Sequence, residues 1–236
     1  MKYILSLGLI FLCLSIYSQN SFETPPPGTI KINDSLFIDN IPVDNLMYKE
    51  FAASAERSWN MEIHDSLQSL ELDEMNMKIL NSLSSKTNNK SLFEKVSKSE
   101  ELHLPEGILT FEYFNLSQYS NNPVIGISKE QAALFCKWRT DMVNLRFNEL
   151  NNQKKTNYKK IAYRLPKNED YKLAKSEFSA NGKFLKLAGR TPLEIDLDDF
   201  RKTQKFVMTK YPEYTSDKNS ETQDYTLFRC ICEVEE

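Results

Sequence analysis

Three features of the sequence predict an α+β fold. Residues 29–32 and 36–38 are apolar runs that flank the polar triplet 33–35, a pattern typical of a β-hairpin. Ser128 and Gln131 have the spacing of a capping box and open a segment whose apolar residues recur every three or four positions, which predicts a helix. The composition, with 40% hydrophobic and 27% charged residues, argues against collagen-like, coiled-coil or largely disordered chains. We therefore expect one compact domain, since 236 residues can bury a core without dense disulfides.

The remaining elements are predicted from helix caps and spacing. Asp44 is a suitable N-cap for a short helix over residues 45–51. Between residues 64 and 84, apolar side chains recur at helical spacing, and this stripe packs either within the domain or against a second copy. Residues 151–160 are rich in lysine and asparagine, which predicts a solvated loop.

The first eighteen residues are typical of a secretory signal peptide. Lys2 gives a positive start, and the apolar run over residues 4–16 is shorter than the roughly 20 residues that span a bilayer. Cys13 follows the large residue Leu12, which disfavours a lipid-attachment site, so cleavage is expected after Ser18. The mature chain, residues 19–236, is then exported to the periplasm or secreted, is envelope-associated and has no membrane span.

The charge balance argues against nucleic acid as a partner. Thirty basic residues stand against 33 acidic residues, which gives a net charge of −3, and no basic face is evident.

The cysteines and histidines show no metal-site spacing. Removal of Cys13 with the signal leaves Cys136, Cys230 and Cys232 in an oxidising compartment. Because three is odd, we expect one bridge and one remaining thiol, or an intermolecular contact. The only histidines, His64 and His103, lack a zinc-binding pattern, and we expect both at the surface. An acidic cluster departs from the EF-hand spacing and is expected to be a solvated face; its members are Glu194, Asp196, Asp198 and Asp199.

Four segments, in this order, carry a family resemblance. Residues 24–51 contain a proline-glycine pair, an apolar strand and an asparagine-x-x-tyrosine-x-x-phenylalanine pattern. Residues 122–139 contain proline-valine-isoleucine-glycine-isoleucine-serine and then Cys136 two positions before a tryptophan. Residues 163–174 begin with tyrosine-arginine-leucine-proline, and residues 227–230 read leucine-phenylalanine-arginine-cysteine. Together these motifs resemble the formylglycine-generating enzyme family, also called the sulfatase-modifying factor domain.

The resemblance implies a compact, irregular α+β fold related to C-type lectin-like domains. It places an insertion near residues 52–121 and a shortened C-terminal half. It also implies a disulfide between Cys136 and Cys230, which would close a loop of about 95 residues and stabilise the fold by ~4–5 kcal/mol in the chain-entropy model. The rival pair, Cys230 with Cys232, would form a small strained ring.

The family's catalytic machinery is missing from the sequence. Active relatives hold copper(I) with two cysteines, whereas no cysteine lies between Ala174 and Leu227, a stretch whose glycines are only Gly182 and Gly189. The resemblance therefore implies a pseudoenzyme, with no catalytic residues, no cofactor and no metal. Its partner would be an envelope or secreted protein, or a glycan, and similar exported relatives from Bacteroidota suggest a secretion or gliding-motility component.

An alternative keeps the oxidase chemistry. Cys230 and Cys232 are two positions apart, so on a strand both thiols point to the same face. Two thiolates placed in this way suit copper(I), which predicts a copper-dependent thiol oxidase with these two cysteines at its centre.

Overall fold

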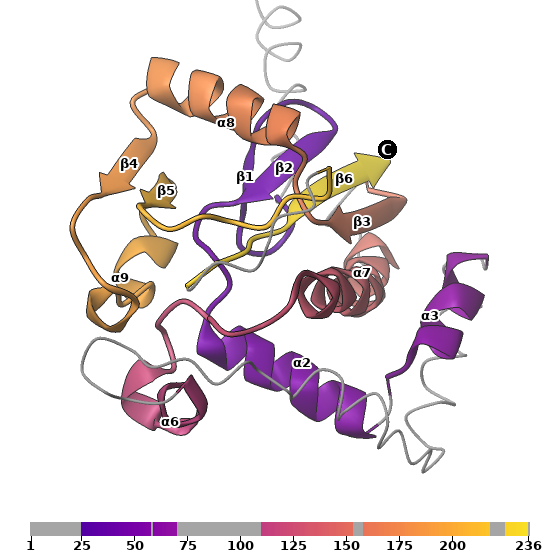
Figure 1. Ribbon diagram of the computed structural model, residues 1–236. Helices are drawn as coiled ribbons and strands as arrows, with labels where there is room; N and C mark the ends of the chain where they lie inside the picture. Colours follow the sequence, from indigo (N-terminus) through magenta and orange to yellow (C-terminus); the bar gives the residue numbers. More distant parts are fainter. Residues whose placement is uncertain (1–24, 58, 70–109, 153–157, 218–224, 236) are drawn as a thin grey trace, which may run out of the picture.

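The computed structural model (Figure 1) describes residues 25–57, 59–69, 110–152, 158–217 and 225–235. Its main sheet has four antiparallel strands: β1 (Thr29–Lys31), β2 (Leu36–Asp39), β6 (Ile231–Glu235) and β3 (Lys160–Arg164), in that spatial order. The predicted hairpin is confirmed as β1 and β2, and Asn33 Oδ1 accepts a hydrogen bond from the Ser35 amide in its turn. The C-terminal strand β6 lies in the middle of the sheet.

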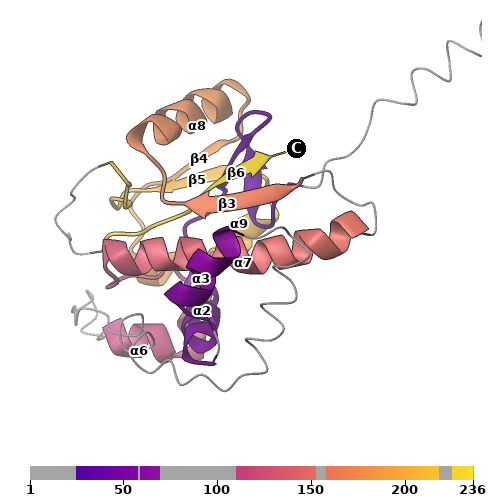
Figure 2. The same ribbon diagram turned by 90° about the vertical axis from the view of Figure 1, so that its right-hand side faces the viewer.

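Helices cover both faces of this sheet, as Figures 1 and 2 show. On one face, α7 (Lys129–Asn152) packs against β3, and both α2 (Asn45–Arg57) and α3 (Met61–Gln68) contact α7. An aromatic cluster fills this side, with Phe51, Phe135 and Phe228 fully buried.

On the opposite face, α8 (Asn168–Ala180) forms a second apolar cluster with the hairpin. Strand β6 contributes to both sides, since Ile231 belongs to the α8 cluster and Cys232 to the α7 cluster. Alternate side chains of a strand point to opposite faces, so the two-residue spacing of Cys230 and Cys232 places both with α7, as predicted.

Short elements complete the described chain. They are α6 (Thr110–Asn115), η1 (Ser117–Tyr119), β4 (Phe184–Leu187), η2 (Pro192–Glu194), α9 (Asp198–Arg201) and β5 (Phe206–Thr209). Strands β4 and β5 pair in parallel as a separate two-stranded sheet. The mixed helices and small sheets confirm the α+β class.

Several predicted boundaries shift. Asp44 Oδ1 accepts the Met47 amide at 2.8 Å, which confirms the N-cap, but α2 continues to Arg57 because Ala52 and Ala55 are also buried. Helix α7 runs to Asn152 and β3 begins at Lys160, so the predicted loop 151–160 is shorter. Of the helix predicted over residues 64–84, the structure describes only the first turns, in α3, and residues 70–109 lie outside the described part of the chain.

The capping box at the start of α7 is confirmed by its contacts. The Gln131 amide donates to Ser128 Oγ at 3.2 Å, and the Ser128 amide donates to Gln131 Oε1 at 2.7 Å. We expect Ser128→Ala to lower the free energy of unfolding by about 1 kcal/mol, measured by urea denaturation, because one amide at the helix end loses its acceptor. Ser176→Ala, at an exposed site within α8, is the control. Equal changes in the two variants would contradict the cap.

Candidate functional site

The three predicted site cysteines lie together in the core between the main sheet and α7. Cys136 belongs to α7, Cys230 directly precedes β6, and Cys232 lies within β6, opposite Phe37 and Tyr163 on the neighbouring strands. All three are free thiols and at most 1% exposed. The Sγ atoms of Cys136 and Cys230 are 3.1 Å apart, so the proposed bridge would join neighbouring groups, and the pairing itself stays a prediction.

A buried ion pair lies next to these thiols. Arg139 Nη1 donates to Asp39 Oδ2 at 2.8 Å, and the same oxygen accepts the Cys230 amide at 2.7 Å. The Arg139 guanidinium stacks on the Tyr163 ring, 4.3 Å from its centroid. The Asp39 carboxylate thus connects the end of β2 with the start of β6 and with α7.

Burial keeps the Cys230 and Cys232 thiols protonated at neutral pH, because it raises the pKa of each. Desolvation is the main cause that raises the pKa of Cys230 well above its ordinary value, and the neighbouring Cys136 raises it further. Desolvation also raises the pKa of Cys232 to about 12, although the charge of Arg139 acts in the opposite direction. Since all three cysteines are at most 1% exposed, this donor set does not fit a copper(I) centre that is open to a substrate. Among the described residues no three histidine, cysteine or acidic side chains group as metal ligands.

His64 corrects the expectation of a surface histidine. It is 6% exposed, and its Nδ1 lies 3.1 Å from both carboxylate oxygens of Asp141, which is fully buried on α7. The Trp59 indole donates to the same carboxylate at 2.6 Å. Local sequence patterns do not reveal this cluster, because Asp141 lies 77 positions from His64 and 82 from Trp59. An aspartate inside the buried part of α7 was the available signal. His103 lies outside the described residues.

The acidic cluster at residues 194–199 is exposed, as predicted. Glu194 accepts the Thr191 amide at the start of η2, and Asp198 forms an ion pair with Arg201 at 3.3 Å. Glu194 and Asp198 therefore interact with residues that are three positions away in the sequence.

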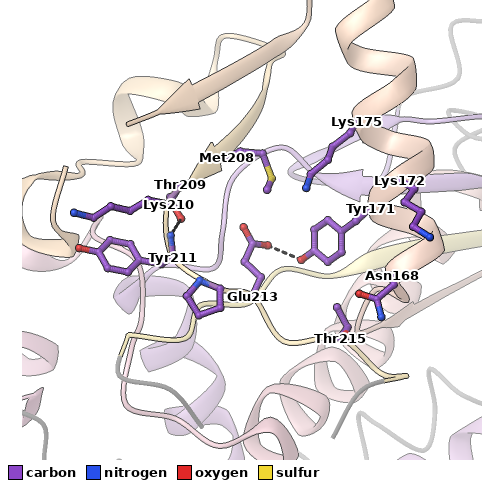
Figure 3. Close-up of a pocket in the computed structure, with 11 residues that line it drawn as sticks. Asn168, Tyr171, Lys172, Lys175, Met208, Thr209, Lys210, Tyr211, Glu213 and Thr215 are labelled. Carbon is purple, nitrogen blue, oxygen red and sulfur yellow. Dashed lines mark hydrogen bonds between the residues drawn. The ribbon is translucent and has the colours of Figure 1, made fainter. Parts of the chain in front are cut away.

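A pocket of about 790 Å³ lies between α8 and a wall formed by the end of β5 and the segment that follows it. Helix α8 contributes Asn168, Tyr171, Lys172 and Lys175, and residues 208–213 and 215 form the opposite wall. Figure 3 shows Lys175 reaching from α8 into the space near Tyr171, whereas Lys172 and Lys210 lie at opposite rims. We call this site the α8 pocket.

A buried network fixes the floor of the α8 pocket. Glu213 Oε2 accepts from the Tyr171 hydroxyl at 2.5 Å and from Arg229 Nε at 2.6 Å, and its Oε1 accepts from Arg229 Nη2 at 2.7 Å. Burial, together with the Glu213 charge, raises the pKa of Tyr171 well above its ordinary value, so this phenol stays neutral and donates. Glu213 therefore has both oxygens engaged by groups of the protein itself.

The sequence pattern alone does not predict this pocket. Lysines three positions apart on α8 share a helical face, which was the one local signal. The opposite wall comes from residues about 40 positions away, and only the fold brings the two walls together.

The four-stranded antiparallel sheet lies between α7 and α8, and its last strand, β6, packs beside Cys136 of α7. This arrangement defines an irregular α+β domain with a cluster of thiols in its core. A family model described as "Sulfatase-modifying factor enzyme 1-like domain" matches residues 14–230. The chain therefore belongs to the sulfatase-modifying factor family, which confirms the resemblance. No curated protein and no solved structure matches the sequence significantly. Within the described part of the chain, none of the helices is long and apolar enough to cross a membrane.

Proposed function

We propose that this protein is an exported, non-catalytic binding module built on the sulfatase-modifying factor scaffold. The observation that carries the proposal is the burial of Cys136, Cys230 and Cys232, each at most 1% exposed in the α7 core, so that none presents a thiol to a substrate. The absence of cysteine between Ala174 and Leu227, where the family's copper ligands are expected, supports the same assignment.

Export follows from the predicted signal peptide over residues 1–18, with residues 19–236 as one domain. On this proposal the partner is an envelope or secreted protein, or a glycan, and the role is that of a secretion, adhesion or gliding-motility component. The scaffold supplies a pocket between α8 and residues 208–215, and a pocket already formed without a ligand favours binding because little ordering is needed.

A copper(I) titration of the reduced protein tests the non-catalytic assignment against the oxidase alternative. We expect the wild-type protein and Cys232→Ala to bind copper(I) equally weakly, with no oxygen consumption in the presence of a thiol substrate. Circular dichroism of both proteins checks that they are folded. Copper binding at least tenfold tighter in the wild-type protein, together with oxygen consumption that the variant loses, would overturn the proposal.

A further inference from the structure

The α8 pocket carries an excess of positive charge on an acidic protein. Its lining contains three lysines and one acidic residue, Glu213, whereas the whole chain has a net charge of −3. Glu213 cannot offset the lysines, because its side chain is 4% exposed and forms a bidentate pair with the fully buried Arg229. The charge of Glu213 is therefore balanced beneath the pocket.

The lysine amines are available to a ligand. Lys172, Lys175 and Lys210 are all exposed. In the part of the chain that the structure describes, Lys172 and Lys175 take part in no ion pair, and Lys210 lies over the Tyr211 ring, near Glu194. Lys175 points into the pocket (Figure 3), where Met208 adds apolar surface.

From this arrangement we propose that the α8 pocket binds a small organic anion through a carboxylate, sulfate or phosphate group held by Lys175, with Lys172 adding positive charge at the rim. The volume of about 790 Å³ lies within the roughly 300–1,000 Å³ of small-molecule sites. Ammonium groups on a shared helical face favour an oxyanion, and the partly apolar walls favour an organic body over a bare ion. This inference deepens the proposed binding function by naming the class of ligand.

The test is a titration of the full-length ¹⁵N-labelled protein, followed by NMR. The probes are glucuronate, glucose 6-phosphate, neutral glucose and inorganic sulfate. We expect the two organic anions to shift the amide signals of residues 168–175 and 208–215, with glucose causing no change. Lys172→Gln/Lys175→Gln should raise the Kd for the anions by about tenfold, from the loss of two exposed charge interactions.

Lys183→Gln/Lys186→Gln is the matched control, since these lysines have the same spacing, are exposed and lie outside the pocket. It should leave the Kd unchanged. Equal Kd values for the wild-type protein and the Lys172/Lys175 variant, or glucose binding as tight as glucuronate binding, would overturn the proposal. Sulfate binding as tight as glucuronate binding would indicate an adventitious ion only, and would also overturn it. None of these results would change the outcome of the copper titration. The proposal of an anion ligand and the proposal of a non-catalytic protein can therefore fail independently.

Discussion

Replacing Arg229 with methionine is expected to lower the free energy of unfolding by about 3–5 kcal/mol, because it leaves the Glu213 carboxylate buried without its cation. Arg229 is fully buried and also donates to the carbonyl oxygens of Asp39 at 3.0 Å and Val207 at 2.7 Å. Its guanidinium lies 4.5 Å from the centre of the Phe206 ring. The Arg229 side chain therefore connects the end of β2, strand β5 and the floor of the α8 pocket. Urea denaturation followed by circular dichroism measures the change.

Two further variants separate the ion pair from lost packing. Arg57→Met, at an exposed site at the end of α2, should change the free energy of unfolding by less than about 0.5 kcal/mol. Adding Glu213→Gln to Arg229→Met should restore part of the lost stability, since no unpaired charge is then buried. An Arg229→Met protein as stable as Arg57→Met would show that the buried pair of Arg229 and Glu213 does not stabilise the fold.

Oxidation of Cys136 and Cys230 to a disulfide is expected to raise the free energy of unfolding by ~4–5 kcal/mol, because the bridge restricts a long loop in the unfolded chain. It would tie α7 to the start of β6, one of the two inner strands of the main sheet. Urea unfolding of the wild-type protein, with and without dithiothreitol, measures the effect.

Variants at two cysteines identify the bridge. Cys136→Ala should remove the effect of dithiothreitol, whereas Cys232→Ala should retain it. Midpoints that dithiothreitol leaves unchanged in the wild-type protein would contradict the bridge.

Local elements could be predicted because their determinants lie a few residues apart. Asp44 caps α2 through the Met47 amide three positions on, and Ser128 and Gln131 satisfy each other's amides. The end of α2 at Arg57 could not be placed in this way, because burial of Ala55 against the rest of the core decides it.

The candidate sites depended on contacts between distant segments. The neighbouring positions of Cys136 and Cys230 followed from the family motifs, whose order implies which segments meet. The family motifs do not imply the other two sites. The contact of His64 with Asp141 forms because α3 packs on α7. The two walls of the α8 pocket meet because α8 lies beside β5. Residue spacing within one segment does not show which distant segment packs against it.

The central claim is that this chain keeps the sulfatase-modifying factor scaffold with structural, not catalytic, cysteines. The most direct test is mass-spectrometric mapping of the exported protein, alkylated with iodoacetamide at pH 8 without reductant, first folded and then in urea. We expect a Cys136–Cys230 linked peptide, and a Cys232 that reacts only in urea, because it is buried and its pKa is raised to about 12. Rapid alkylation of both Cys230 and Cys232 in the folded protein would contradict the claim.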